Sequence, residues 1–312
     1  MAIKDAFIVA GVRTAIGNFG GTLAPVRADD LAAHVLEALL KKVPGFNPGA
    51  IEDVILGCAN QAGEDNRNVA RMALLLAGYP INVGGETVNR LCASGMSSVV
   101  NAARAIQVGA GDIYVAGGIE HMTRGPWVLS KASAPFGRDQ QLFDSSFGWR
   151  FINPKLDELY GTDPMGMTAE NLAELHQISR EDQDRFAAWS QEKATKAQKA
   201  GILAEEIAPF AIPRKKQDPL IFDQDEFIRS GTTMETLAGL KPAFKKDGSV
   251  TAGNASGLND GAAALLMASD TGLKDHNLKP IARIVSAAVS GVEPRIMGIG
   301  PVEASRKALE RA

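Results

Sequence analysis

The sequence predicts an α/β fold in which helices layer against a largely parallel sheet. Over the first 120 residues, short apolar runs alternate with segments whose apolar residues recur at helical spacing. This alternation breaks off near residue 121 and returns only after residue 250. With 312 residues the chain exceeds one typical domain, and its 45% hydrophobic and 22% charged residues are ordinary for a globular protein.

The first 120 residues supply the strands and helices of this fold in turn. Strands are expected at residues 6–10, 53–57, 86–89 and 112–116. Asp29 is placed to cap the first helix, whose apolar residues recur every three or four positions from Leu31 to Val43, and two more helices are expected at residues 69–77 and 94–108. Glycine or proline signals mark loops or ends at residues 11–21, 78–80 and 117–118. The helix at 94–108 offers for packing Met96, Val99, Val100, Ala103 and Ile106.

Residues 121–249 read as a long inserted segment, rich in glycine, proline, methionine and aromatic residues. It contains one clear helix, at residues 168–200, and few strand signals. An unstructured stretch of this length is uncommon in a compact domain, so we expect the segment to carry its own helices and to serve binding. Strand patterns resume at residues 261–268 and 282–289, and a helix follows from about residue 302. This last unit repeats the opening order of strand, glycine loop and helix, as if a second similar domain began there.

Charge and cysteine content exclude several classes of protein. A formal charge of −3 and a pI near 5.9 give no general attraction to nucleic acid or anionic membranes, and the one basic triplet, at residues 214–216, reads as a solvated loop. Only two cysteines are present, which fits a reducing cytoplasm better than a disulfide framework. The first ten residues contain too short an apolar run for a signal peptide or a membrane span. We therefore expect a cytoplasmic protein without nucleic-acid or membrane partners.

Cys92 is the strongest candidate for a reactive side chain. It lies in residues 89–96, where an extended run passes into a helical one, so its thiol should lie at a helix N-terminus. The unpaired N–H groups and the dipole of a helix favour an anion there, and thiolates at such positions form at lower pH than in free cysteine. The three residues that follow are small and leave room for a bulky thioester. Cys58, in an apolar strand, reads as a small hydrophobic core residue.

In this segment and in five others the chain resembles the thiolases, acyl-CoA acyltransferases that join or split 3-oxoacyl-CoA. The matching motifs occupy residues 13–17, 89–95, 116–120, 165–171, 251–262 and 297–301. The resemblance implies a layered α/β/α/β/α thiolase fold, assembled through its N-terminal domains into homodimers or homotetramers. It implies an N-terminal domain at residues 1–120 and 250–280, an inserted CoA-binding loop domain at residues 121–249, and the beginning of a second, similar C-terminal domain at residues 281–312.

The resemblance also assigns roles to individual residues. Cys92 would be the nucleophile that becomes acylated, with coenzyme A or acetyl-CoA as substrate, no permanently bound cofactor and no metal. Ala252 and Ser256 would touch the pantetheine arm, and Arg229 would lie near the nucleotide. The full set of implied CoA contacts is Leu156, Met165, Arg229, Leu240, Phe244, Ala252 and Ser256.

Three motifs that thiolases need are absent from these 312 residues. They are a Gly-His-Pro histidine that activates the cysteine, an Asn-Glu-Ala-Phe asparagine that helps to build an oxyanion site, and a second cysteine, in Cys-x-Gly, that shuttles the proton. The four histidines stand in other contexts, and no cysteine follows Cys92. Because this absence coincides with the end at Ala312, we expect a chain truncated within its C-terminal domain. Such a chain should lack thiolase turnover by itself, while slow acylation of Cys92 stays open.

Substrate choice is expected to depend on short segments around the acyl group. Residues 57–68 and 148–154 are similar to those of the 3-oxoadipyl-CoA thiolases of aromatic degradation, and each segment contains an arginine able to grip a distal carboxylate in two-pronged fashion. Pro164 stands where many short-chain biosynthetic members carry a histidine, which weakens a simple acetoacetyl-CoA assignment. The candidate residues of the acyl pocket are Arg67, Arg150, Met165 and Met297.

Three other interpretations are left open by the residues. The chain would then be an acetoacetyl-CoA-specific acetyl-CoA acetyltransferase, a ketoacyl synthase, or a non-catalytic thiolase-like subunit that binds CoA. Ketoacyl synthases share the cysteine at a helix start but condense decarboxylatively with two histidines, and residues 251–262 together with the inserted segment argue against them. A Cys92 that reacts with iodoacetamide and is protected by CoA esters would favour an enzyme over the subunit.

Overall fold

The computed structural model of the protein describes residues 3–312 and divides the chain into two compact units. Unit 1 gathers the chain up to Pro126, with Ile202–Glu226 and Leu258–Val285. Unit 2 consists of Trp127–Gly201, Phe227–Gly257 and Ser286–Ala312. Residues 202–226, which the sequence places in the inserted segment, thus lie in unit 1. The expected division into an N-terminal domain, a loop domain and the start of a C-terminal domain stays a prediction.

A seven-stranded sheet forms the centre of unit 1. Its order is β11 (Ala282–Arg283), β1 (Ala6–Arg13), β10 (Asn259–Ser269), β5 (Ile113–His121), β3 (Asp53–Gly57) and β4 (Gly84–Val88), and β2 (Gly17–Asn18) pairs with β10. Only the β3–β4 and β3–β5 pairs are parallel, whereas β10 runs antiparallel to β5, β1 and β2. The α/β class is confirmed, but the prediction of a largely parallel sheet is wrong, because β10 returns from far along the chain between β1 and β5.

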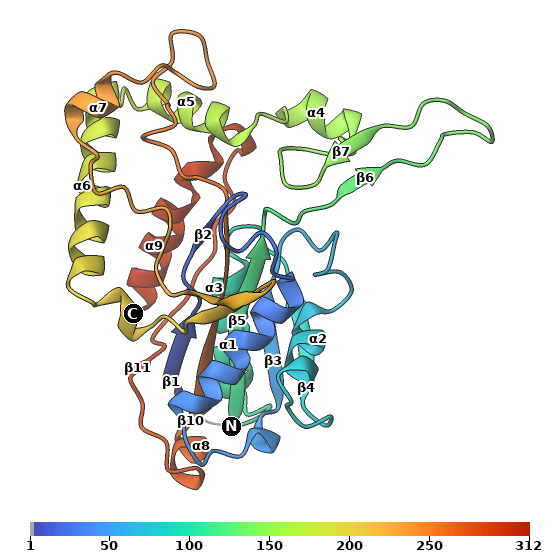
Figure 1. Ribbon diagram of the computed structural model, residues 1–312, viewed down its shortest axis with the longest axis vertical. Coiled ribbons are helices and arrows are strands. Elements are labelled where there is room, and N and C mark those ends of the chain that lie inside the picture. Colours follow the sequence, from blue (N-terminus) through green and yellow to red (C-terminus); the bar gives the residue numbers. More distant parts are fainter. Residues whose placement is uncertain (1–2) are drawn as a thin grey trace. The chain divides into compact units, whose positions relative to one another are not determined.

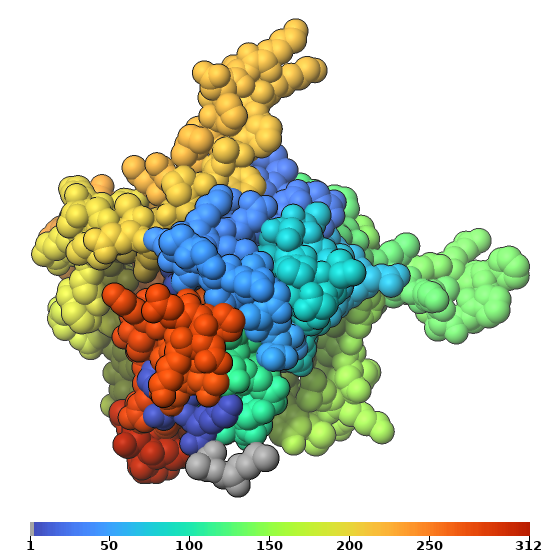
Figure 2. Space-filling view, turned by 90° about the horizontal axis from the view of Figure 1, so that it is seen from below, coloured from blue at the N-terminus to red at the C-terminus, as the bar shows by residue number. Residues whose placement is uncertain are grey.

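Helices cover both faces of this sheet (Figure 1). α1 (Ala28–Lys42) and α2 (Val69–Leu76) pack side by side on one face, and α3 (Ser94–Gln107) packs on the other. Successive side chains of a strand point to opposite faces of the sheet, so that Val54 and Leu56 face α1 and α2, while Ile55 faces α3. Figure 2 shows α1, in blue, beside α2, in cyan, on one surface of the unit. A 3₁₀ turn (Pro48–Ala50) and α8 (Asp270–Asp275) complete this part of the chain.

Several boundaries in unit 1 differ from those that the sequence predicts. Arg27, not Asp29, is the residue before α1, and the Asp29 carboxylate lies in the first turn, where it accepts two hydrogen bonds from Arg27. β1 continues through residue 13, so the loop expected at 11–21 begins later and contains β2. β5 runs past Gly117 and Gly118 to His121, because a side chain at Gly117 would collide with the backbone of β10, which approaches closely there.

Unit 2 contains all the described α-helices beyond residue 126 except α8. They are α4 (Pro154–Tyr160), α5 (Met165–Leu175), α6 (Arg180–Lys199), α7 (Met234–Ala238) and α9 (Gly300–Arg311), with a 3₁₀ segment η3 at Pro294–Ile299. The single helix expected at residues 168–200 is wrong, since Gln177 adopts a left-handed φ of 53° and Ser179 caps a new helix through the Asp182 N–H. The strand expected at residues 282–289 is reduced to the two residues of β11.

Two short hairpins also interrupt the segment in which few strands were expected. β6 (Trp127–Leu129) pairs with β7 (Leu142–Asp144) in unit 2, and β8 (Phe210–Arg214) pairs with β9 (Gln217–Phe222) in unit 1, after a 3₁₀ turn at Leu203–Glu205. Within residues 3–312, none of the helices combines the length and the apolar character that a bilayer crossing requires.

Candidate active site

Cys92 lies in the turn between β4 and α3, two residues before the helix begins, and it is exposed. This is the placement at a helix start that the sequence predicts. Leu91, just before it, has a left-handed φ of 50°, a conformation that costs a non-glycine residue about 1–3 kcal/mol. Ser94 supports the turn, because its hydroxyl accepts the Arg90 N–H at 2.8 Å and donates to the Leu91 carbonyl at 2.6 Å. Across residues 3–312, no acceptor hydrogen-bonds to the Cys92 N–H.

Small residues let the start of α3 lie directly against the sheet. Gly57, at the end of β3, touches the backbone of Ser94 so closely that an added Cβ would lie 2.6 Å from its carbonyl oxygen. Ser98 is fully buried, and its hydroxyl lies 2.7 Å from the Gly117 carbonyl and accepts the Gly117 N–H at 3.0 Å. These contacts fix the first turn of α3 to β3 and β5. The turn that carries Cys92, residues 89–93, therefore projects from a closely packed base.

Cys58 provides the contrasting thiol. It is 1% exposed, and its Sγ donates to Asp65 at 3.5 Å. Burial, reinforced by the carboxylates of Glu120 and Asp65, raises the pKa of the Cys58 thiol far above its usual range. Its sulfur and the two carboxylates lie within 4.8 Å of one another, a spacing that could hold a metal ion. Those carboxylates already accept backbone N–H groups, from Ala59, Asn60, Gln61 and Gly63. The cluster thus acts as a clamp on the loop after β3.

His121, the histidine that follows the Gly-Gly-Ile-Glu run, has a packing role in unit 1. It is 2% exposed, its Nε2 lies 3.2 Å from the Leu23 carbonyl, and its Nδ1 lies 3.3 Å from Asp260. Burial opposes ionisation of Asp260, but hydrogen bonds from His121 and Thr123 outweigh it and lower the pKa of that carboxyl group. The ring is therefore held inside the unit by Leu23 and Asp260.

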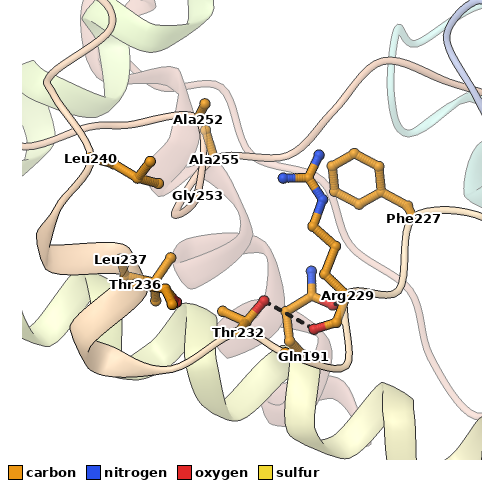
Figure 3. Close-up of a pocket in the computed structure, with 11 residues that line it drawn as sticks. Gln191, Phe227, Arg229, Thr232, Thr236, Leu237, Leu240, Ala252, Gly253 and Ala255 are labelled. Carbon is orange, nitrogen blue, oxygen red and sulfur yellow. Dashed lines mark hydrogen bonds between the residues drawn. The ribbon is translucent and has the colours of Figure 1, made fainter.

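Unit 2 contains a cavity of about 290 Å³ between α6, α7 and the loop after residue 250 (Figure 3). Its walls mix small, polar and apolar side chains with one arginine, as a site for a ligand with polar and apolar parts requires. The residues that line it are Gln191, Phe227, Arg229, Gly231, Thr232, Thr236, Leu237, Leu240, Ala252, Gly253 and Ala255.

Arg229 is the one charged residue of this cavity. In Figure 3 its guanidinium and the Phe227 ring extend from the same loop toward the Ala252–Ala255 side, and the guanidinium lies 5.3 Å from the ring centroid. The backbone N–H of Arg229 donates to the side-chain oxygen of Gln191 on α6 at 2.8 Å, and this bond fixes the backbone at Arg229. Among the residues that the structure describes, no carboxylate pairs with the Arg229 guanidinium. The charge is therefore available to an anionic ligand.

An ion pair holds the cavity walls together. Arg180, the first residue of α6, donates to Asp184 at 2.8 Å and to the carbonyls of Leu237 and Leu240 at 2.6 and 3.1 Å. Asp184, almost fully buried, accepts in turn from the side chain of Asn254 at 2.9 Å. One network therefore connects α6 with α7 and with the loop that carries Ala252 and Gly253.

The cavity brings together three of the seven expected CoA contacts, namely Arg229, Leu240 and Ala252. The other four lie elsewhere in unit 2. Phe244 packs against Gly166 beside Met165, which begins α5 and is 62% exposed, Leu156 is on α4, and Ser256 adjoins the lining residue Ala255. Met297, the other expected pocket residue, lies in η3, which packs against α5.

Sequence reasoning missed Gln191, Phe227 and the two threonines of the cavity wall, Thr232 and Thr236. Gln191 stands on a strongly polar helix, where one more polar residue gives no signal. Phe227 had a usable signal, since it lies two residues before Arg229, the spacing that puts two side chains on one side of an extended segment.

The two arginines proposed for substrate choice have different surroundings. Arg67 is exposed, has a left-handed φ of 61°, and makes no hydrogen bond or ion pair with the described part of the chain. Arg150 is half-buried and donates to the Ser145 carbonyl at 3.0 Å. Arg67 lies in unit 1 and Arg150 in unit 2.

Comparison with known proteins identifies the class to which this site belongs. The family description "Thiolase, N-terminal domain" matches residues 6–271. The chain belongs to the thiolase family, and it is an acyltransferase that acts on acyl-CoA thioesters.

Its relatives narrow the assignment. The chain is 56% identical over 310 residues to an Escherichia coli K12 protein named 3-oxoadipyl-CoA/3-oxo-5,6-dehydrosuberyl-CoA thiolase, and covers 77% of that protein. It resembles the crystal structure of the Bacillus anthracis acetyl-CoA acetyltransferase with a TM-score of 0.90 and 42% identity, over 99% of this chain and 77% of that one. It also resembles human mitochondrial 3-ketoacyl-CoA thiolase in complex with CoA, with a TM-score of 0.88 and 40% identity, over 100% of this chain and 76% of that one.

Proposed function

We propose that the enzyme cleaves or forms 3-oxoacyl-CoA through an acyl-Cys92 intermediate and that 3-oxoadipyl-CoA is its preferred substrate. The observation that carries the first part is the exposed Cys92 in front of α3, in contrast to the buried, protonated Cys58. A relative named for 3-oxoadipyl-CoA, identical at 56% of positions over almost the whole chain, supports the second part.

The chemistry follows from the nucleophile. The Cys92 sulfur attacks the C3 ketone, the C2–C3 bond breaks, and acetyl-CoA leaves with a proton while the remaining acyl group stays on sulfur as a thioester. The thiolate of a second CoA then takes the acyl group and frees Cys92. The Cys92 N–H, which has no acceptor among the described residues, is suited to stabilise the oxyanion, and one such donor contributes about 100-fold or more in rate.

The cavity in unit 2 is our candidate for the nucleotide and pantetheine parts of CoA. The unpaired guanidinium of Arg229 suits a phosphate, and the Phe227 ring beside it offers an apolar surface. Leu240 and Ala252, from the apolar wall, would contact the pantetheine arm. The further contacts that we assign to CoA on the family resemblance are Leu156, Met165, Phe244 and Ser256, and Met297 would border the acyl group with Met165.

For the distal carboxylate of 3-oxoadipyl-CoA we favour Arg67 over Arg150. Arg67 has no partner in the described chain to compete with a carboxylate, whereas Arg150 already donates to a backbone carbonyl. An Arg67→Ala variant should lose binding of 3-oxoadipyl-CoA and keep that of acetoacetyl-CoA. Equal losses with both substrates would remove this assignment.

An acetoacetyl-CoA-specific acetyl-CoA acetyltransferase is the second candidate, because the solved structure named acetyl-CoA acetyltransferase is 42% identical. Rates of Cys92 acylation by the two 3-oxoacyl-CoA compounds decide between the candidates. We also propose a homodimer or homotetramer: β4 forms one edge of the sheet, and within the described residues its one strand partner is β3, so its outer edge could pair with a second chain except at the Gly85 carbonyl, which accepts from the Asn68 side chain.

Intact-protein mass spectrometry tests the nucleophile directly. Incubation with 3-oxoadipyl-CoA should add one succinyl group to the chain and release acetyl-CoA. Cys92→Ser should abolish the adduct, and Cys58→Ser, which changes the buried thiol, should retain it. An adduct that survives Cys92→Ser, or no adduct at any time on the parent chain, would overturn the proposed role of Cys92.

A further inference from the structure

Asn89, the first residue after β4, ties the nucleophile turn to a neighbouring loop. Its Oδ1 accepts the Leu91 N–H at 2.8 Å, and its Nδ2 donates to the Ala59 carbonyl at 3.0 Å. A single planar amide therefore bridges two main-chain segments that are 30 residues apart in the sequence. Leu91 is the residue with the left-handed φ of 50°, and it directly precedes Cys92. The hydrogen bond acts at the most strained point of the turn.

The loop that Asn89 holds is anchored in the sheet. Glu120, near the end of β5, accepts the Ala59 N–H at 2.8 Å and the Asn60 N–H at 3.2 Å. Ala59 is thus bound on its N–H by Glu120 and on its carbonyl by Asn89. A continuous chain of hydrogen bonds leads from β5 through the loop to the backbone immediately before the nucleophile.

We propose that Asn89 is a positioning residue for Cys92, fixing the turn through the Leu91 N–H, with Glu120 as the outer support of this contact. The inference rests on the proposed role of Cys92 as the nucleophile. Displacing reacting atoms by about 1 Å can reduce a rate about 100-fold, so a group that sets the backbone beside the sulfur affects acyl transfer without touching the substrate. A side-chain cap that only closes a turn would instead affect stability alone.

The test measures acylation of Cys92 by acetyl-CoA in the full chain. In this step an S–C bond forms between Cys92 and the acetyl group, the S–C bond of acetyl-CoA breaks, and the proton of the thiol passes to CoA. The variants are Asn89→Ala, which removes both bonds, and Asn89→Asp, which keeps the acceptor for Leu91 but loses the donor to Ala59. Asn47→Ala is the matched control, because the exposed Asn47 Oδ1 likewise accepts the N–H two residues further on, that of Gly49 at 3.0 Å, in a turn outside the segments assigned to the substrate.

Two readouts separate positioning from a structural role. For Asn89→Ala we expect the limiting acylation rate to fall about tenfold or more while the half-saturating acetyl-CoA concentration stays within about twofold. Asn89→Asp should recover part of the rate, and Asn47→Ala should match the parent chain. Hydrogen exchange at the Leu91 amide should be faster in Asn89→Ala than in the parent.

Parental acylation rates in Asn89→Ala, or a lowered melting temperature with an unchanged limiting rate, would overturn the inference. Failure of the parent chain to acylate would count against the proposed function instead. Hydrogen exchange would then decide the inference by itself, because an equally protected Leu91 amide in Asn89→Ala refutes it.

Discussion

Replacing Gly57 by alanine tests how the turn that carries Cys92 is held against the sheet. Gly57 does not need glycine for its backbone conformation, because its φ is not in the left-handed region. It needs glycine for space: an added Cβ would lie 2.6 Å from the Ser94 carbonyl oxygen and closer still to the adjacent carbonyl carbon. These are backbone atoms at the start of α3, so no side chain can rotate away. The helix would have to retreat by 0.8 Å to restore an ordinary contact of 3.4 Å with this oxygen, and by more for the nearer carbonyl carbon.

The retreat has a cost that can be estimated. Forcing a methyl group into a packed site typically costs about 1–3 kcal/mol, and moving α3 also strains the bonds between Ser98 and Gly117. We expect Gly57→Ala to lower the free energy of unfolding by about 3 kcal/mol. At about 2–4 °C for each kcal/mol, the melting temperature should fall by about 6–12 °C.

Gly95→Ala is the matched control, since Gly95 lies in the first turn of the same helix. Its added Cβ would meet its nearest neighbour, the Gly117 carbonyl oxygen, at 3.8 Å, an ordinary contact. Alanine in place of a helical glycine should stabilise the chain by up to about 1 kcal/mol. Differential scanning fluorimetry of both variants checks the opposite signs. If Gly57→Ala melts within about 1 °C of the parent chain, the argument that close packing fixes the start of α3 is refuted.

Three further predictions follow from the hydrogen bonds and ion pairs. Ser98→Ala should lower the free energy of unfolding by about 2 kcal/mol, because it removes the hydroxyl that hydrogen-bonds to the buried backbone of Gly117 in β5. An unchanged midpoint of urea unfolding would contradict this. Arg180→Ala should raise the Kd for CoA about tenfold in calorimetry, because its guanidinium holds the cavity wall. Arg185→Ala, on the exposed side of the same helix, should change this Kd by less than about twofold. Equal effects of the two substitutions would be evidence against the network. Hydrogen bonding from Arg124 lowers the pKa of Glu64 below its ordinary 4.5, so the stabilisation is complete above that pH and is lost as the pH falls through the folded value. As the pH falls below about 5, the melting temperature of Glu64→Gln should therefore decrease less than that of the parent chain. The same decrease in both would show that the Glu64–Arg124 pair does not contribute to stability.

Local patterns in the sequence were sufficient for the elements that surround Cys92. β3 occupies the expected residues 53–57, and α3 begins at Ser94 as predicted. Periodicity did not reveal which face of α3 is buried at its start, and Met96, expected to pack, is 73% exposed. In the first turn of α3, contact with the sheet is made by small residues, so the largest apolar side chain is not the one that packs.

Contacts between distant segments account for most of the errors. The direction of pairing in the sheet depends on β10, whose partners in β5 and β1 lie more than a hundred residues earlier in the chain, and no local pattern encodes that return. The split between α5 and α6 depends on one left-handed residue and one capping serine, features that the helical spacing on either side conceals. The cavity likewise combines α6, α7 and the loop around Ala252, so only residues carried by the family resemblance were anticipated.

The surroundings of Cys92 in unit 1 are made almost entirely of main chain. Its turn is held by backbone groups bonded to Asn89 and Ser94, and the helix behind it is seated by glycine contacts and one buried hydroxyl. Two charged side chains add to these contacts: Arg90 Nε donates to the Ser97 hydroxyl on α3 at 2.8 Å, and Glu120 accepts the N–H of Ala59, the residue to which Asn89 donates. A substitution at the exposed Arg67, which has no partner in the described chain, should therefore leave this turn unchanged, whereas a single methyl group at Gly57 presses directly on the backbone of Ser94.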